Sequence, residues 1–196
     1  MPRLDPLPVE ELPAELQPIL QYAEATMGFM ANDVLTMAHW PELLRAMGAV
    51  VGVTFTPGSV DMALKRRVGF ISSMSAGCQY CAAHNGVGFP DDGIEPAKRD
   101  AIWAYETSPL FTDAERAALN FARAVGQTPN ALTDAEFAEL QAHFDTRQIM
   151  ELAGVICLFG FLNRWNSTFS TALEGKPRDY AEEFLSPHGW TIGPHE

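Results

Sequence analysis

The sequence predicts an all-α protein. Apolar residues recur at three- and four-residue spacing over most of the chain, which is the period of a helix that buries one face. A Thr or Asp is followed three residues later by Glu or Gln at Thr112, Thr133 and Asp145, and this capping-box pattern marks helix N-termini. No run shows sustained alternation of apolar and polar residues, which a half-buried strand would require.

Length and composition favour a single domain that spans residues 1–196. A chain with 47% hydrophobic and 19% charged residues can bury a substantial core. The net charge of −12 argues against nucleic acid or an anionic membrane as a partner, because both are bound by clustered Lys and Arg. The short run Lys65-Arg66-Arg67 is interpreted as a solvated helical turn or a subunit contact.

Neither a leader nor a membrane span is apparent in the sequence. The N-terminus lacks a basic stretch followed by an apolar run, and this predicts a cytoplasmic protein. The most apolar segment, 149–162, carries Glu151 and is shorter than the roughly 20 residues that span a bilayer. It is predicted to be a buried core helix, in which Cys157 is an unreactive core residue.

The first part of the chain is predicted to form an extended arm and then three helices. Four prolines within the first thirteen residues exclude a continuous helix, so residues 1–12 are expected to lie on the surface or across a neighbouring subunit. Helical periodicity then covers about 13–28, 32–39 and 41–55. The turn Thr56-Pro57-Gly58 ends the third helix.

Two helices are expected around the cysteines. Ser59 is predicted to cap the first, since its hydroxyl can accept a hydrogen bond from a free amide of the first turn. This helix is expected to end before Cys78, because residues 72–77 are small and polar. A short helix then begins at the cysteines and ends near Gly86, and a helix N-terminus lowers the pKa of a thiol.

The second half is predicted to continue with helices. One covers 95–105, three follow the capping boxes, and Pro177 and Pro187 bound a last short helix before a loosely held tail, 187–196. The segment 163–166 occupies the place in its helix that 78–81 occupies in the earlier one. Two related helical halves are therefore an open alternative. Asn163, Trp165 and Asn166 are interpreted as core and capping residues that would line a pocket if the halves face each other.

Cys78, Cys81 and His84 are the candidate catalytic residues. Their spacing of three places them on one side of a helix. One thiol can then reach the other, and an imidazole lies near the second thiol, where it can act as base or acid. Tyr80 has only a minor claim to be a proton donor.

The cysteine pair has three interpretations: a redox dithiol, half of a zinc site, or an accident. Structural zinc needs four ligands, and the other histidines show no paired spacing. Haem attachment needs a histidine directly after the second cysteine, where Ala82 stands. The redox interpretation needs a thiolate, a resolving thiol and a base, and all three are present. No metal and no cofactor are expected.

The stretch Gly77-Cys78-Gln79-Tyr80-Cys81-Ala82-Ala83-His84 resembles the AhpD-like alkylhydroperoxidases of the carboxymuconolactone decarboxylase superfamily, in their peroxidase-related branch. The resemblance extends over about residues 10–170, through 27–30, 39–44, 111–119 and 161–164. It implies an all-α AhpD-like helical bundle that is usually oligomeric. Members with the cysteine pair reduce hydroperoxides through a dithiol to disulfide cycle, whereas the decarboxylase branch generally lacks the pair.

Two departures from the family pattern concern the proton relay. The fullest family motif carries a glutamate twelve residues before the first cysteine, and Arg66 stands there in this chain. Arginine cannot accept the imidazole N–H, although its charge could lower the pKa of a nearby thiol. The histidine follows the second cysteine at the third position instead of the fourth.

These observations predict a cytoplasmic, homo-oligomeric thiol peroxidase. Cys81 attacks the peroxide and Cys78 resolves the sulfenic acid, although the helix N-terminus would favour Cys78 as the thiolate. An external dithiol resets the enzyme, and the resemblance implies a lipoyl-bearing or thioredoxin-like reductant. A decarboxylase or lactone-type isomerase on the same scaffold, and a redox-sensing or interaction module without turnover, are the alternatives.

Overall fold

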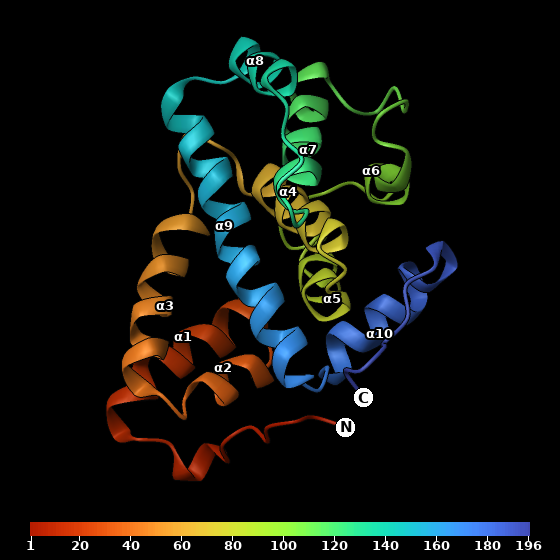
Figure 1. The fold of residues 1–196 in the computed structure, drawn as a ribbon. Helices are drawn as coiled ribbons and strands as arrows, with labels where there is room; N and C mark the ends of the chain where they lie inside the picture. Colours follow the sequence, from red (N-terminus) through yellow and green to blue (C-terminus); the bar gives the residue numbers. More distant parts are fainter.

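The all-α prediction is confirmed by the fold. The computed structural model describes the backbone of residues 1–196 and every side chain except that of Thr26. All regular structure in this described chain is helical (Figure 1). The α-helices are α1 (Gln17–Met27), α2 (Asn32–Met37), α3 (Pro41–Thr54), α4 (Met62–Ser75), α5 (Gln79–Val87), α6 (Pro96–Asp100), α7 (Asp113–Val125), α8 (Asp134–His143), α9 (Thr146–Phe169) and α10 (Gly175–Phe184), and the 3-10 helices are η1 (Val9–Glu11), η2 (Ala14–Leu16), η3 (Ala101–Ala104) and η4 (Ser186–His188).

The 24-residue helix α9 divides the core into two parts. On one side, α4, α5 and α7 pack against it around Val68, Phe70 and Leu119. On the other side, α1, α2 and α3 form a smaller cluster around Leu16 and Leu20. Figure 1 shows the two groups of helices on either side of α9. The boundary between the two clusters is where the candidate site lies.

The three capping boxes predicted from the sequence are all present. In each, the side chain of the N-cap residue accepts a hydrogen bond from the third helical residue, whose own side chain accepts one in return from the N-cap backbone. These reciprocal bonds satisfy amides that the helix leaves free. The pairs are Thr112 with Glu115, Thr133 with Glu136, and Asp145 with Gln148.

The predicted cap of α4 is wrong by two residues. Asp61 is the N-cap, and its carboxylate accepts a hydrogen bond from the backbone N–H of Leu64 at 2.7 Å. The backbone N–H of Ser59 donates instead to Glu151 of α9, at 3.1 Å. A Cβ at Gly58 would lie only 2.5 Å from the same carboxylate. The loop before α4 is therefore shaped by Glu151, which leaves Asp61 to cap the helix.

The interpretation of the basic run in α4 as solvated is also wrong. Lys65 is 1% exposed and Arg67 is 4% exposed. The Lys65 ammonium lies 2.9 Å from Glu151, and the Arg67 guanidinium lies 2.7 Å from Glu115 of α7. Because α4 packs against α5, α7 and α9, its charged residues are enclosed, and each needs a carboxylate partner.

Helix α9 packs against both groups of helices but leaves part of its surface exposed. The prediction of a core helix over 149–162 is confirmed at Leu152, Val155 and Phe159, which are buried, whereas Met150 is 65% exposed. Cys157 is exposed as well and lines an open groove of about 680 Å³ with Phe161 and Trp165. Apolar residues therefore lie on the exposed part of this helix as well as on the faces that pack against other helices. No helix among the described residues combines the length and hydropathy needed to cross a membrane.

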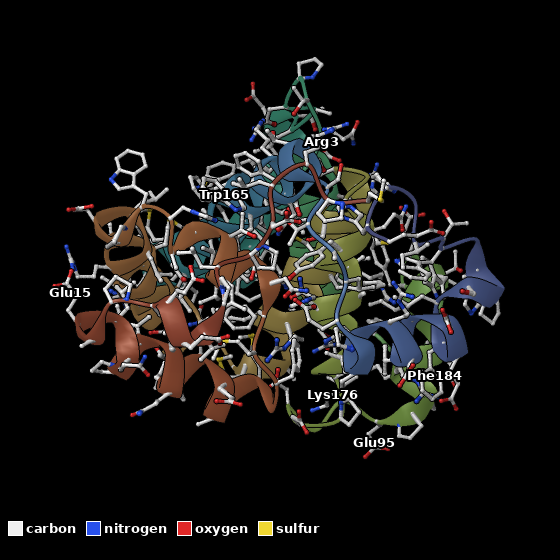
Figure 2. All side chains as sticks on the ribbon, turned by 90° about the horizontal axis from the view of Figure 1, so that it is seen from below. Arg3, Glu15, Glu95, Trp165, Lys176 and Phe184 are labelled. Carbon is white, nitrogen blue, oxygen red and sulfur yellow. The ribbon has the colours of Figure 1, made fainter. Side chains whose placement is uncertain are left out.

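The N-terminal arm lies against its own chain. The backbone N–H of Arg3 donates to the carbonyl oxygen of Phe169 at 2.8 Å, and that of Leu7 donates to the carbonyl oxygen of Leu35 at 3.3 Å. Figure 2 shows Arg3 beside the end of α9. These bonds place the arm over the junction of α2 and α9.

The C-terminal tail is held firmly, contrary to the prediction for 187–196. Trp190 and His195 are buried. The Trp190 indole N–H donates to the carbonyl oxygen of Gln79 at 3.0 Å, and the backbone N–H of Leu173 donates to the carbonyl oxygen of His195 at 2.9 Å. The tail thus folds back onto the first turn of α5, where the cysteines lie.

Candidate active site

The two cysteines lie at the N-terminus of α5, as predicted. Cys78 is the N-cap residue, and its sulfur accepts a hydrogen bond from the backbone N–H of Cys81 at 3.5 Å. Both thiols are free and buried, with exposures of 1% and 2%. The dithiol is therefore shielded from bulk water.

The surroundings of the two thiols shift their pKa values in opposite directions. A hydrogen bond from the Cys81 thiol is the largest influence on Cys78 and lowers its pKa, and although burial opposes this, the Cys81 amide and the charge of His84 lower it further. Burial, followed by the neighbouring Cys78, raises the pKa of Cys81 well above its ordinary value. When the pair loses its first proton, the negative charge therefore resides on Cys78, at the helix N-terminus.

Asn166 of α9 contacts the second cysteine. Its side-chain amide Nδ2 lies 3.4 Å from Cys81 Sγ and 3.3 Å from Asp33 Oδ2. Asn166 is fully buried. The interpretation of Asn166 as a core or capping residue is therefore incomplete, because its amide joins the sulfur to a carboxyl group of α2.

His84 is oriented by Glu174, a residue that the sequence analysis missed. The imidazole Nε2 lies 2.6 Å from Glu174 Oε2. The other carboxylate oxygen of Glu174 accepts hydrogen bonds from the Tyr80 hydroxyl, at 2.7 Å, and from the backbone N–H of Asn32. Glu174 thus provides the carboxylate that the family pattern places where Arg66 stands.

Helix α10 delivers Glu174 to the site. Glu174 is its N-cap residue, and the helix then packs along α5. A Cβ at Gly86 would lie 2.7 Å from the Tyr180 ring, so this close approach requires a glycine. At the other end, the Arg99 guanidinium lies 3.9 Å from the centre of the Phe184 ring. In Figure 2 the labelled Lys176 and Phe184 mark the two ends of this helix.

His84 and Glu174 shift each other's pKa. Burial alone would lower the pKa of His84, but the Glu174 carboxylate, with smaller contributions from Asp33 and Cys78, raises it above the ordinary value of 6.5. Burial would likewise raise the pKa of Glu174, but His84 and the hydrogen bonds lower it. The Tyr80 ring stacks on the imidazole with centroids 4.2 Å apart. The Glu174 carboxylate therefore favours the protonated form of His84, which can donate a proton.

The charge of Arg66 is paired with a carboxylate and is not free to act on the dithiol. Its guanidinium forms an ion pair with Asp92 at 2.6 Å and lies over the Phe55 ring, 4.7 Å from its centre. Arg66 also lines a cavity that Cys81 and His84 share. The nearby carboxylate neutralises the charge that the sequence suggested could lower a thiol pKa.

An internal cavity of about 220 Å³ opens between the two core clusters. Cys81 and His84 line it, together with Asp33, whereas Cys78 does not. The remaining wall is mostly apolar and comes from α1, α2, α3 and α9. Cys81 is therefore the sulfur that a molecule in the cavity can reach. The apolar lining includes Met27, Phe29, Met37, Met47, Phe159 and Leu162.

Among the described residues, no three histidine, cysteine, aspartate or glutamate side chains are grouped so that they could hold one metal ion.

Replacing Glu174 with glutamine is expected to lower the pKa of His84. Without the carboxylate, burial dominates and favours the neutral ring. Nuclear magnetic resonance titration of the imidazole C–H signals measures the change: the wild-type pKa should lie above 6.5 and the pKa of Glu174→Gln below it. Glu182→Gln, an exposed change on the same helix, should leave the titration unaltered. An unchanged His84 pKa in Glu174→Gln would show that the pair does not control the imidazole.

Comparison with known proteins places the chain among solved structures. The apo debrominase Bmp8 superposes with a TM-score of 0.87 at 32% identity, over 92% of this chain and 97% of that one. A cysteine-to-alanine variant of Bmp8 in complex with 2,3,4-tribromopyrrole gives the same TM-score and identity. An AhpD-core, peroxidase-related protein from Ralstonia eutropha JMP134 has a TM-score of 0.78 at 22% identity, over 90% of this chain and 94% of that one.

The match to a curated protein sequence covers less of the chain than the structural matches do. The uncharacterized protein YnjA of Escherichia coli K12 is 33% identical over 98 residues, which are 50% of this chain and 54% of YnjA. The match thus spans about half the length of that relative. No protein-family model matches the chain. With 32% identity over nearly the whole of both chains, the protein belongs to the same family as the debrominase Bmp8, and it shares its fold with the AhpD-core, peroxidase-related protein.

Proposed function

We propose that this protein is a dithiol-dependent reductase that converts organic hydroperoxides to alcohols. Cys78 and Cys81 supply the two electrons as they form a disulfide. One observation carries the proposal: Cys81 lines the cavity next to the N-cap residue Cys78, and His84, held by Glu174, lines the same cavity. Nucleophile, resolving sulfur and acid are the three groups that such a cycle needs.

The first step breaks the peroxide bond. The proton of the Cys81 thiol passes to Cys78 along the hydrogen bond between the two sulfurs, so that Cys81 becomes the nucleophile. Its sulfur attacks the terminal oxygen of the hydroperoxide and becomes a sulfenic acid as the O–O bond breaks. The alkoxide that leaves takes a proton from His84, which the Glu174 carboxylate at 2.6 Å holds in place. One alcohol is formed.

The second step forms the disulfide. Cys78 gives up its proton and attacks the Cys81 sulfur, and the hydroxyl group leaves as water. The sum of both steps is ROOH plus two thiols giving ROH, water and a disulfide. An external dithiol then restores the thiols. A lipoyl-bearing or thioredoxin-like donor and a homo-oligomeric assembly stay predictions.

The walls of the cavity favour an organic substrate over hydrogen peroxide. Apolar side chains, several of them methionine and phenylalanine, make up most of the lining of its 220 Å³. Burying the apolar part of a hydroperoxide against them contributes about 25 cal/mol per Å² of apolar surface. Hydrogen peroxide has no such surface. A compact apolar group on the hydroperoxide should therefore raise kcat/KM.

Reductive removal of a halogen from an aromatic ring is the second candidate. The observation that favours it is the 32% identity with a debrominase whose complex contains 2,3,4-tribromopyrrole. The same dithiol can perform this reaction: the Cys81 sulfur takes the bromine from carbon, the ring carbon takes a proton, and Cys78 displaces bromide as the disulfide forms. Both candidates consume two electrons from the same pair of thiols.

One experiment tests both candidates. The reduced protein is mixed separately with cumene hydroperoxide, hydrogen peroxide and 2,3,4-tribromopyrrole, and the Cys78 to Cys81 disulfide is followed by mass spectrometry. We expect the fastest disulfide formation with cumene hydroperoxide and repeated turnover when excess dithiothreitol is present. Faster bromide release than peroxide consumption would favour the debrominase. Free thiols after all three treatments would overturn the dithiol reductase altogether.

A further inference from the structure

A second acidic group faces the reactive sulfur. Asp33 lies in the first turn of α2 and lines the cavity together with Cys81 and His84. It approaches from the smaller core cluster, opposite the helix that carries the cysteines. The fold therefore brings two groups that can donate a proton to the cavity that Cys81 lines, His84 from α5 and Asp33 from α2.

Asn166 connects Asp33 to that sulfur. The single amide nitrogen Nδ2 lies 3.3 Å from Asp33 Oδ2 and 3.4 Å from Cys81 Sγ. One amide nitrogen therefore links the carboxyl group of Asp33 to the sulfur of Cys81. Asp91 is the other carboxyl-bearing residue among those that line the cavity. It lies in the loop after α5 that also holds Asp92, the partner of Arg66.

The surroundings of Asp33 raise its pKa, so that its carboxyl group keeps a proton more readily than it would in water. Burial is the largest influence and raises its pKa, while the charge of His84 lowers it and that of Glu174 raises it again. The backbone N–H of Asp33 donates to the Tyr80 hydroxyl at 3.3 Å. The titratable groups that face the carboxyl group are thus Tyr80, Cys81 and His84 of α5 and Glu174 before α10.

The proposed cycle needs two protons at two moments. The alkoxide takes the first from His84, which is then neutral. The hydroxide that leaves in the second step is a poor leaving group and also needs a proton as the S–O bond breaks. That bond is on Cys81, the sulfur beside Asn166 and Asp33. A separate acid at this position would let the second step proceed without waiting for His84 to be protonated again.

We propose that Asp33 is a second catalytic acid, which protonates the hydroxyl group that leaves the Cys81 sulfenic acid as the disulfide forms; this assignment rests on the proposed reductase function. In this step the Cys78 thiolate forms the S–S bond and the S–O bond breaks. The Asp33 O–H proton passes to the departing oxygen and gives water. Cys78 is oxidised, the Cys81 sulfur is reduced, and the Asp33 carboxylate regains its proton from solvent. Asn166 is a positioning residue that holds the carboxyl group beside the sulfur.

The test follows both steps separately in Asp33→Asn. Single-turnover mixing with cumene hydroperoxide is quenched at intervals, with dimedone present to trap sulfenic acid. The variant should form sulfenic acid at the wild-type rate but close the disulfide roughly 100-fold more slowly, since general acid catalysis contributes at least about that factor. Sulfenic acid on Cys81 should then accumulate, and added acetic acid should accelerate closure in the variant by replacing the missing carboxyl group.

The pH dependence provides a readout that a structural role would not change. In the wild type, the rate of disulfide closure should fall as the pH rises through the Asp33 pKa, because only the protonated carboxyl group can donate. Asp33→Asn should lose this dependence. Asp134→Asn alters an exposed aspartate in the first turn of α8 and serves as the matched control, with both steps expected to be unchanged.

The outcomes distinguish a failure of the proposed function from a failure of the Asp33 assignment. If the wild type forms no disulfide with any oxidant, the proposed function itself is wrong. If the wild type forms the disulfide and Asp33→Asn closes it equally fast, the assignment of Asp33 as an acid is wrong. Equal slowing of sulfenic acid formation and of closure would also overturn it, because this would show that the substitution disturbs the site as a whole.

Discussion

Replacing Cys81 with serine is expected to abolish peroxide reduction, with a loss on the order of 10⁴ to 10⁶-fold, the scale seen when an enzyme loses its nucleophile. Cys81 is the cysteine that lines the cavity, so a hydroxyl group there leaves the substrate facing a poor nucleophile. Cys78→Ser should behave differently. It should consume one equivalent of peroxide and stop at the sulfenic acid, because the resolving sulfur is gone.

Quenched single-turnover reactions analysed by mass spectrometry distinguish the two roles. Cys81→Ser should remain unmodified, while Cys78→Ser should gain one oxygen that dimedone traps on Cys81. Cys157→Ser is the matched control, since this third cysteine is exposed on α9 and outside the cavity. The opposite pattern, with sulfenic acid on Cys78 in Cys81→Ser, would mean that the lower pKa of Cys78 decides which sulfur attacks and that access from the cavity does not.

The reactive motif could be predicted because its geometry is local. Cys78, Cys81 and His84 are separated by single turns, so the helical period alone places them on one side. The capping boxes were predictable for the same reason, as both partners lie within one turn. The cap of α4 was mistaken because Ser59 and Asp61 are equivalent candidates by local rules. A contact to Glu151, far away in the sequence, decides between them.

The rest of the site comes from segments that no local pattern connects to the motif. Glu174 is 90 residues from His84 and reaches it only because α10 packs along α5. Asp33 precedes the motif and lies on a short helix from the other core cluster. Either residue could equally have been a surface helix cap. The sequence contained one signal, the absence of a local carboxylate. Because Arg66 stands in the family's glutamate position, a partner for His84 had to come from elsewhere in the chain.

Burial was the other property that residue type did not reveal. Charge suggested that Lys65 and Arg67 are solvated, but α4 is enclosed by three helices, and its cations pair with carboxylates on α7 and α9. Apolar neighbours suggested that Cys157 is buried, but this thiol lies on a part of α9 that the rest of the chain does not cover. In both cases the packing of whole helices determined exposure, and this depends on contacts distant in sequence.

The ion pair of Lys65 with Glu151 gives the largest expected effect on stability. The ammonium and carboxylate lie 2.9 Å apart, and both residues are buried. Glu151 also accepts hydrogen bonds from the backbone of Ser59 and Val60 and from Arg147, at 3.1, 3.2 and 2.8 Å. A single carboxylate therefore joins α9 to α4 and to the loop before it.

Glu151→Gln is expected to destabilise the fold by about 3–5 kcal/mol, the cost of leaving a buried charge without its partner. Urea denaturation followed by circular dichroism measures this loss. Adding Lys65→Met should recover most of it, since the unpaired charge is then removed while the glutamine oxygen still accepts from the loop. Glu139→Gln, which alters an exposed pair with His143, should have little effect. A double variant no more stable than Glu151→Gln would show that the charge on Lys65 is not the cause.

The same carboxylate sets a dependence of stability on pH. Burial would raise the pKa of Glu151, but the hydrogen bonds from Arg147, Lys65 and the loop amides lower it from 4.5 to about 2. Because the pKa is lower in the folded state, the stabilisation is complete above pH 4.5 and is lost as the pH falls towards 2. The difference in unfolding free energy between wild type and Glu151→Gln should thus stay constant above pH 4.5. It should narrow in acid, as the wild-type side chain becomes neutral like the glutamine that replaces it. A difference that stayed constant down to pH 2 would show that the lost hydrogen bonds cause the instability and that the charge does not.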